Sequence, residues 1–270
     1  MKVLFCGDVV GRSGRRIVET KIPELRRALD LDFVAVNGEN AAHGFGITAK
    51  ICESFFASGV DAITTGNHVW AQREIVEYIG RERRVLRPVN MDAGAPGRGA
   101  QVYTIADGRK VLIIHPMGKL FMPPVSDPFA AVAANLDNWR LGHMVECIVV
   151  DVHAEATSEK MAMAHAFDGR VSMVVGSHTH IPTADAQILP GGTAYQTDMG
   201  MCGDYNSVIG MKKRGAVQRF LDPESGLRLE PASGEATLCG VYLETDDETG
   251  LARRVAPLRL DGRIAAAWPV

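Results

Sequence analysis

The chain has 270 residues, 46% of them hydrophobic and 23% charged, so it can bury a substantial core, and we expect a single α/β domain spanning 1–270. A formal charge of −3, from 29 basic and 32 acidic residues, gives no electrostatic footprint for gripping a long nucleic acid. A small anionic ligand is not excluded, because a local site can be positive on an acidic protein.

Two features indicate the compartment. The chain opens on "MKVLFCGDVVG" without a signal-peptide core, and no apolar run approaches the roughly 20 residues of a membrane helix. Five scattered cysteines form no CxxC pair, which is typical of reduced thiols. We therefore expect a cytoplasmic protein with no membrane partner.

Strand-like and helix-like segments alternate along the first third of the chain, as in layered α/β folds. The predicted elements are a strand at 2–5, a helix at 15–29, a strand at 33–40, a helix at 48–59, a strand at 61–68 and a helix at 72–80. Proline is disfavoured inside a helix, so Pro23 is expected to divide the first one. Thr48 is the predicted N-cap of the second helix, and Gly59 lies just past its end.

The pattern changes around 101–115, which reads as a β-hairpin turning at Asp107 and Gly108. The next elements are a helix near 128–141 and buried strands at 145–155 and 171–180, followed by strands at 193–198, 236–246 and 253–260. No internal repeat or long linker suggests a second domain.

Metal-ligand residue types follow five of the buried strands. They are Asp8 in "FCGDVVG", Glu39 and Asn40 in "VNGENAA", Asn67 and His68 in "TTGNHVW", His153 in "VVDVHAE", and His178 and His180 in "GSHTH". Ligands of open α/β sheets bind outside the carboxyl ends of the strands, so these loops are expected to converge. Gly7, Gly38, Gly66 and Gly176 are expected to let the backbone turn sharply beside them.

Each signal alone has a structural explanation. Asp8 could cap a helix, "GNH" could be a turn, and His153 could be a hydrogen-bonded core histidine. Five independent strand ends carrying oxygen or nitrogen ligands are hard to explain by structural need alone. The set of carboxylates, amides and imidazoles suits manganese, iron or zinc, and it contains too many ligands for one ion. Two divalent ions, roughly +4 against about −2 from Asp8 and Glu39, would leave an electropositive centre for a phosphate ester.

The series "GD", "NGEN", "GNH", "H" and "GSHTH", over residues 7 to 180, resembles the calcineurin-like dinuclear metallophosphoesterases. Longer segments, including "NGENAAHGFGIT", "DVHAEATSEKMAMA" and "ILPGGTAYQTDMGMCG", resemble its bacterial cyclic-nucleotide branch, the 2′,3′-cyclic-nucleotide 2′-phosphodiesterases, up to about residue 213. The resemblance implies a layered α/β/β/α sandwich of mixed sheets flanked by helices.

The resemblance also implies roles for the site residues. Asp8 and His180 would bind the first ion, Glu39 would bridge the two ions, and Asn67, His153 and His178 would bind the second. Val10 stands where the superfamily has a histidine ligand, and Asn40 is the nearest residue to fill that gap. Iron is the first expectation for the metal and manganese the second.

The implied activity is hydrolysis of 2′,3′-cyclic and also 3′,5′-cyclic nucleotides by a hydroxide bridging two ions, with His68 protonating the leaving oxygen or stabilising the transition state. A nucleotide phosphomonoesterase, or a regulatory protein with a vestigial metal site that binds a partner, are the alternatives. The sequence leaves subunit number open, a homo-oligomer included.

Several residues near these motifs keep more than one explanation. His43 and His115 follow strands and are candidates for the substrate pocket. Thr157 or Ser158 with a nearby Glu resembles a helix start, while an acidic side chain after His153 could instead orient that histidine. Asp198 and Asp204 could shape the rim of the site or serve turns.

Overall fold

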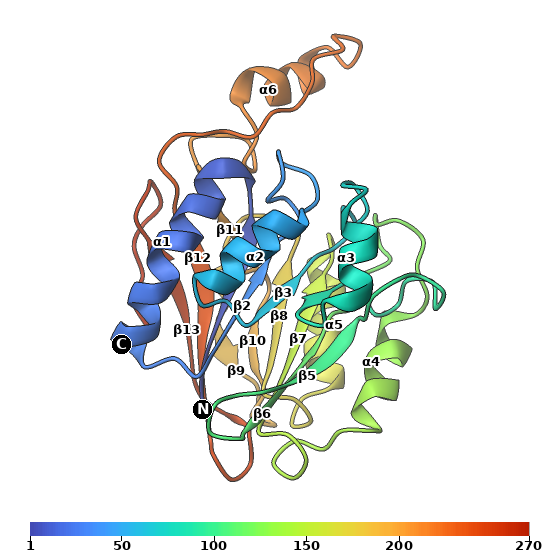
Figure 1. Cartoon of the computed structure of the whole chain (residues 1–270), viewed down its shortest axis with the longest axis vertical. Helices are drawn as coiled ribbons and strands as arrows, with labels where there is room; N and C mark the ends of the chain where they lie inside the picture. Colours follow the sequence, from blue (N-terminus) through green and yellow to red (C-terminus); the bar gives the residue numbers. More distant parts are fainter. Residues whose placement is uncertain (270) are drawn as a thin grey trace.

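A computed structural model describes residues 1–269, which form two mixed β-sheets packed face to face with helices on the outer faces (Figure 1). The first sheet has the strand order β13-β12-β1-β2-β3-β4, with β11 paired to β1. Its strands are β1 (Lys2–Val9), β2 (Phe33–Asn37), β3 (Ala62–Thr64), β4 (Val85–Leu86), β11 (Met201–Cys202), β12 (Leu238–Thr245) and β13 (Ala252–Leu260).

The second sheet has the order β5-β6-β7-β8-β10-β9. Its strands are β5 (Ala100–Thr104), β6 (Lys110–Ile114), β7 (Cys147–His153), β8 (Met173–Ser177), β9 (Gln187–Ile188) and β10 (Ala194–Gln196). In each sheet the central strands run parallel and antiparallel strands lie towards the edges. The helices are α1 (Gly11–Leu29), α2 (Ala49–Ala57), α3 (Ile75–Arg81), α4 (Pro128–Leu136), α5 (Thr157–Ala166) and α6 (Lys213–Leu221).

Three clusters of buried apolar residues hold the layers of the fold together. Because successive strand residues face opposite sides, Val3 and Phe5 of β1 pack between the two sheets, while Leu4 and Cys6 pack towards α1 and α2. The third cluster joins the other face of the second sheet to α4 and α5, with Val132 as one member. The predicted α/β/β/α sandwich is therefore confirmed.

Most predicted elements are present, and several details match. Thr48 is the N-cap of α2, its side chain accepting a hydrogen bond from the Ile51 backbone at 3.3 Å, and Gly59 after the helix has φ +98°. The hairpin of β5 and β6 turns at Gly108, which has φ +92°. Two short strands of the first sheet (β4 and β11), one of the second (β9) and helix α6 were not anticipated.

The prediction that Pro23 divides the first helix is wrong, because α1 runs through it. Proline removes one backbone hydrogen bond at a cost of about 3 kcal/mol. Buried side chains on both sides of Pro23, such as Ile22 and Leu25, form one continuous stripe, and each buried side chain stabilises by roughly 1.5–3 kcal/mol. Burial of this stripe therefore outweighs the local cost.

No helix within residues 1–269 is long and apolar enough to cross a membrane. All five cysteines are buried and free.

Candidate metal centre

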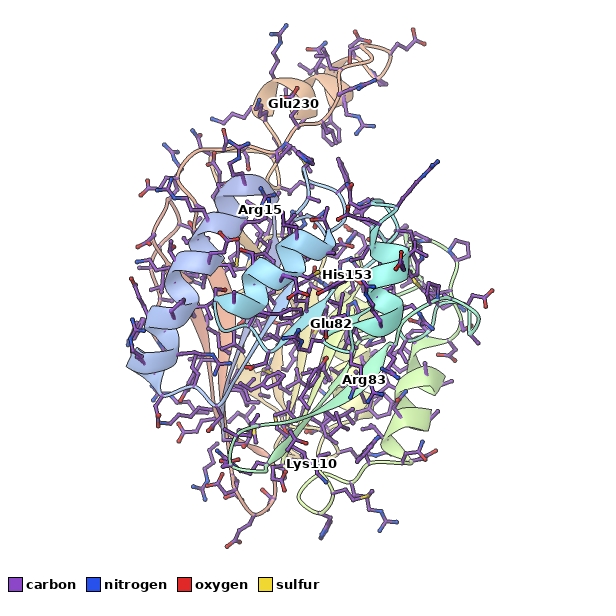
Figure 2. All side chains as sticks on the ribbon, viewed as in Figure 1. Arg15, Glu82, Arg83, Lys110, His153 and Glu230 are labelled. Carbon is purple, nitrogen blue, oxygen red and sulfur yellow. The ribbon has the colours of Figure 1, made fainter. Side chains whose placement is uncertain are left out.

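The polar residues predicted from the strand ends gather at the carboxyl ends of β1, β2, β3, β7 and β8. Asp8 lies near the end of β1, Glu39 two residues after β2, and His153 is the last residue of β7. In Figure 2 the label of His153 lies near the middle of the molecule. Both sheets therefore contribute to a single site.

Three of these residues form a compact donor cluster. Ligand atoms of Glu39, His153 and His178 all lie within 4.8 Å of one another. The Nε2 atom of His153 lies 3.0 Å from Glu39 Oε1, 3.0 Å from Asn67 Oδ1 and 3.2 Å from His178 Nδ1. Four electron-rich side chains thus face one point, an arrangement that suits a cation.

The orientation of the His153 ring is fixed by Ser177 and Asp151, through the ring nitrogen that faces away from the donor cluster. Ser177 Oγ lies 3.0 Å from His153 Nδ1 and donates to Asp151 Oδ1 at 2.7 Å, so Nδ1 is the protonated nitrogen of His153. The lone pair then lies on Nε2, which faces the donor cluster. A carboxylate that fixes a histidine tautomer through a hydrogen bond is a recurring feature of metal sites.

Asp8 and His180 form a second group next to this cluster, and Asn40 lines the same cavity as His180. Asp8 Oδ1 lies 3.9 Å from His180 Nε2, and His180 Nδ1 is fixed by the Ile209 carbonyl at 2.7 Å. Asp8 Oδ1 and Asn40 Oδ1 are two of the six buried side-chain atoms within residues 1–269 that have no hydrogen-bond partner. Buried oxygens are rarely left unpaired, so these two orphaned acceptors fit a cation. Val10, also buried, contributes no donor here.

The two histidines of "GSHTH" point to different parts of the site. Strand β8 ends at Ser177, and His178 and His180 both have left-handed backbones, with φ +96° and +68°. His178 contacts His153, whereas His180 approaches Asp8. Strained non-glycine conformations of this kind concentrate at functional sites.

Burial and neighbouring charges set the protonation of the donors. Burial lowers the pKa of His178 to about 3, with His153 adding to the effect, and burial also lowers the pKa of His180. Burial alone would raise the pKa of Glu39, but His153 and His68 outweigh it and hold that pKa at about 2. The imidazoles of His178 and His180 are therefore neutral and Glu39 is ionised, the forms that bind a metal.

Asp8 differs from Glu39. Burial, together with the nearby carboxylates of Asp198 and Glu39, raises the pKa of Asp8 well above its usual value. A cation at the orphaned oxygen of Asp8 would relieve this repulsion.

His68 lies beside the donor cluster. Its backbone N–H donates to Glu39 Oε2 at 3.1 Å, and its half-buried ring packs edge-on against Phe45 with centroids 5.0 Å apart. Both side chains line a cavity of about 280 Å³ that also contains Glu39, Asn40, Glu155, His178, Thr179, His180, Ile209, Met211 and Leu229. We call it the metal-centre cavity.

The expected role of the glycines needs correction. Gly7, Gly38, Gly66 and Gly176 do not have positive φ, so a sharp left-handed turn is not what requires them. A Cβ on Gly66 would lie 2.2 Å from His153 Nε2, and a Cβ on Gly7 would lie 1.9 Å from the Gly200 carbonyl oxygen. These positions are glycine because other groups approach the backbone closely.

The residues that follow His153 also differ from the prediction. Ala156, not Thr157, is the N-cap of α5, and it makes no side-chain capping bond. Glu155 lies 3.3 Å from Nε2 of His178 rather than beside His153. Buried Glu159 accepts the backbone N–H of Lys119 at 2.8 Å.

A buried ion pair that supports the loop containing His178 and His180 was not predicted from the sequence. Lys160 and Asp198 are fully buried and paired at 2.8 Å, and Asp198 also accepts hydrogen bonds from the backbone N–H and hydroxyl of Thr179. Asp198 therefore holds the residue between the two histidines. Lys160 gave no sequence signal, because a lysine on a predicted helix normally faces solvent.

The two-sheet fold and the donor set together define a metallophosphoesterase-like protein. The chain belongs to the YmdB-like protein family, whose model matches residues 4–258. It is 43% identical, over 94% of its length and 95% of the relative's, to a Bacillus subtilis protein named 2′,3′-cyclic-nucleotide 2′-phosphodiesterase.

Two solved structures are similar over nearly the whole chain. A Thermus thermophilus protein described as hypothetical has 39% identity and a TM-score of 0.90, with 97% of this chain and 100% of that chain covered. A Mycoplasma pneumoniae protein described as a novel phosphatase has 34% identity and a TM-score of 0.89, with coverage of 97% and 93%. The family predicted from the motifs is confirmed.

Proposed function

We propose that this chain is a metal-dependent phosphodiesterase that hydrolyses 2′,3′-cyclic nucleotides and, on the same centre, 3′,5′-cyclic nucleotides. The main support is the pair of orphaned buried acceptors, Asp8 Oδ1 and Asn40 Oδ1, next to the donor cluster of Glu39, His153 and His178. The name of the Bacillus subtilis relative supports the substrate class.

The residues fit two ions. Asp8, Asn40 and His180 would hold the first, Asn67, His153 and His178 the second, and Glu39 would contact both. Iron is our first assignment and manganese our second, since mixed imidazole, amide and carboxylate ligands suit both metals. The carbonyl oxygen of Asn40 is available because its amide nitrogen donates to Gly44 O at 3.0 Å.

When bound, the ions would lower the pKa of an attacking water and neutralise charge on the phosphate. His68 would give a proton to the leaving oxygen, a role that its position in the metal-centre cavity, outside the donor cluster, allows. Phe45, Ile209 and Leu229 supply an apolar wall that a nucleoside could contact.

Hydrolysis of 2′,3′-cyclic AMP by chelator-stripped protein, before and after addition of manganese or iron, tests the proposal. Metal-restored formation of 3′-AMP is the expected result. The Mycoplasma relative is described as a phosphatase, so nucleotide monoesters are assayed in parallel. Turnover of monoesters alone would favour a phosphomonoesterase, and no turnover by fully metal-loaded protein would favour the regulatory alternative.

A further inference from the structure

A second cavity, of about 590 Å³, lies beside the metal-centre cavity and is strongly basic. Its charged lining consists of Arg12, Arg15, Lys212, Arg228 and Glu230, and His43 also lines it. Figure 2 shows Arg15 and Glu230 at the end of the molecule from which α6 projects. We call it the basic cavity.

The two cavities are neighbours. Leu229 lines both, and Met211 of the metal-centre cavity is followed directly by Lys212 of the basic cavity. A Cβ on Gly44 would lie 3.0 Å from Met211 Cε and 3.5 Å from Cδ of Pro231, which lines the basic cavity. The side chains that line the two cavities are therefore close together around Gly44.

The segment 39–46 connects the two cavities along the chain. Glu39 and Asn40 line the metal-centre cavity, while His43, in a left-handed conformation with φ +54°, lines the basic cavity. Arg15 donates to the Ala41 carbonyl and so holds this segment against α1. A ligand that extends from the donor cluster past this segment would reach the basic cavity.

The positive charge of the basic cavity is largely uncompensated. Within residues 1–269, the one ion pair formed by its cations joins Lys212 to Glu230 at 2.6 Å, and both of these side chains are exposed. Arg12, Arg15 and Arg228 form no ion pair within those residues, and Glu19 is the acidic residue whose charge acts on Arg15. The overall charge of the chain is −3. Guanidinium groups bind phosphate through two parallel hydrogen bonds, which makes a phosphate the natural ligand.

We propose that the basic cavity binds a second phosphate of the substrate, the one attached to the 5′-oxygen of the nucleoside whose cyclic phosphate occupies the metal centre. This proposal rests on the proposed function and specifies its substrate. The preferred substrates carry a phosphate in addition to the scissile diester: a 5′-phosphorylated 2′,3′-cyclic nucleotide, or the 2′,3′-cyclic end of a short oligonucleotide.

The test compares kcat/KM of the manganese-loaded protein for three substrates: 2′,3′-cyclic AMP, its 5′-phosphorylated form, and adenylyl-adenosine ending in a 2′,3′-cyclic phosphate. Two or more charge-assisted hydrogen bonds to the second phosphate should raise kcat/KM for the two phosphate-bearing substrates about tenfold or more. The gain should shrink as salt rises. If both phosphate-bearing substrates show the gain, the basic cavity accepts a terminal 5′-phosphate as well as an internucleotide phosphate. If the dinucleotide alone shows it, the ligand of the basic cavity is the internucleotide phosphate.

The double variant Arg12→Gln/Arg228→Gln should abolish this gain and leave hydrolysis of 2′,3′-cyclic AMP unchanged. Arg15 is retained, because it also holds the Ala41 carbonyl. The matched control is Arg83→Gln, an exposed arginine away from the end that carries α6 (Figure 2), and it should keep the gain. Equal kcat/KM for all three substrates, or a full gain in the double variant, would overturn the proposal.

A binding measurement separates failure of this proposal from failure of the proposed function. If 2′,3′-cyclic AMP is not turned over, calorimetry compares adenosine 3′,5′-bisphosphate with 3′-AMP on the manganese-loaded protein. Binding of the bisphosphate about tenfold tighter, lost in the double variant, supports the basic cavity independently of turnover. Equal affinities would rule it out.

Discussion

Gly66 has no room for a side chain, because a Cβ there would lie 2.2 Å from His153 Nε2 and 2.3 Å from Glu39 Oε2. Gly66→Ala should therefore push apart two predicted metal ligands. We expect lower metal content and a loss of about 1–3 kcal/mol in the free energy of unfolding, as for other overpacked sites. Elemental analysis and urea unfolding measure the two effects.

Gly80→Ala is the matched control. Gly80 lies in α3, and a Cβ there would meet nothing within 4 Å. This variant should keep its metal and gain up to about 1 kcal/mol, because alanine is the better helix former. Full metal content in Gly66→Ala would show that the site relaxes around the added methyl group.

The position of His68 outside the donor cluster leads to a second prediction. His68→Ala should lower kcat by about 10²–10⁴-fold, the usual contribution of a general acid, while metal content stays full. Steady-state kinetics with elemental analysis of the same sample measures both, and His165→Ala, at an exposed residue of α5, is the control. Loss of metal from His68→Ala would make His68 a ligand instead.

At the scale of residues, the sequence was informative where a polar side chain follows a buried strand. Asp8, Glu39 and His153 were predicted in this way, and the structure brings them together. No sequence signal marked the features that depend on contacts between segments far apart in the chain. The glycine at 66 is explained only by the approach of His153 from another sheet, and burial of Lys160 depends on Asp198 38 residues away.

The loop after β8 depends on the buried ion pair of Lys160 and Asp198. Lys160→Met would leave the carboxylate buried without its counter-charge, and breaking such a pair costs about 3–5 kcal/mol. We expect a loss of that size in urea unfolding, with reduced metal content because Asp198 also holds Thr179 between the two histidines. Lys50→Met, on the exposed surface of α2, should change stability by less than about 0.5 kcal/mol.

A loss of less than about 1 kcal/mol in Lys160→Met would mean that the other hydrogen bonds of Asp198 suffice to hold it. One of these is the Gly200 backbone N–H, which donates to Asp198 Oδ1 at 2.8 Å. Metal content would then stay full as well.

Helices and turns were predicted correctly where the signals in the local sequence are strong. The cap at Thr48 and the turn at Gly108 are local chemistry and were predicted correctly. The continuity of α1 through Pro23 depends on the side-chain stripe packed against the sheet, which proline rules do not include. Helix α6 was missed because its sequence, "KRGAVQRFL", contains a glycine and shows no clear apolar face.

On the scale of the whole molecule, the site joins the two sheets. Asp8 and Glu39 come from the first sheet, and His153 and His178 from the second. Alternating strands and helices were enough to predict an α/β protein, and the motif resemblance supplied the two-sheet arrangement. Periodicity alone could not have done so, because it does not say which strands pair.

A cation that binds donors from both sheets should stabilise the folded chain as a whole. Binding at 1,000 times Kd adds about 4 kcal/mol, which for a chain of this size corresponds to about 10 °C in Tm. Chelation should lower Tm by about this amount, and added manganese should restore it, as followed by calorimetry. His178→Ala removes one predicted ligand and should abolish most of the manganese effect, while His165→Ala should retain it. An unchanged Tm after verified removal of metal would show that the two sheets hold the donors in place without a cation.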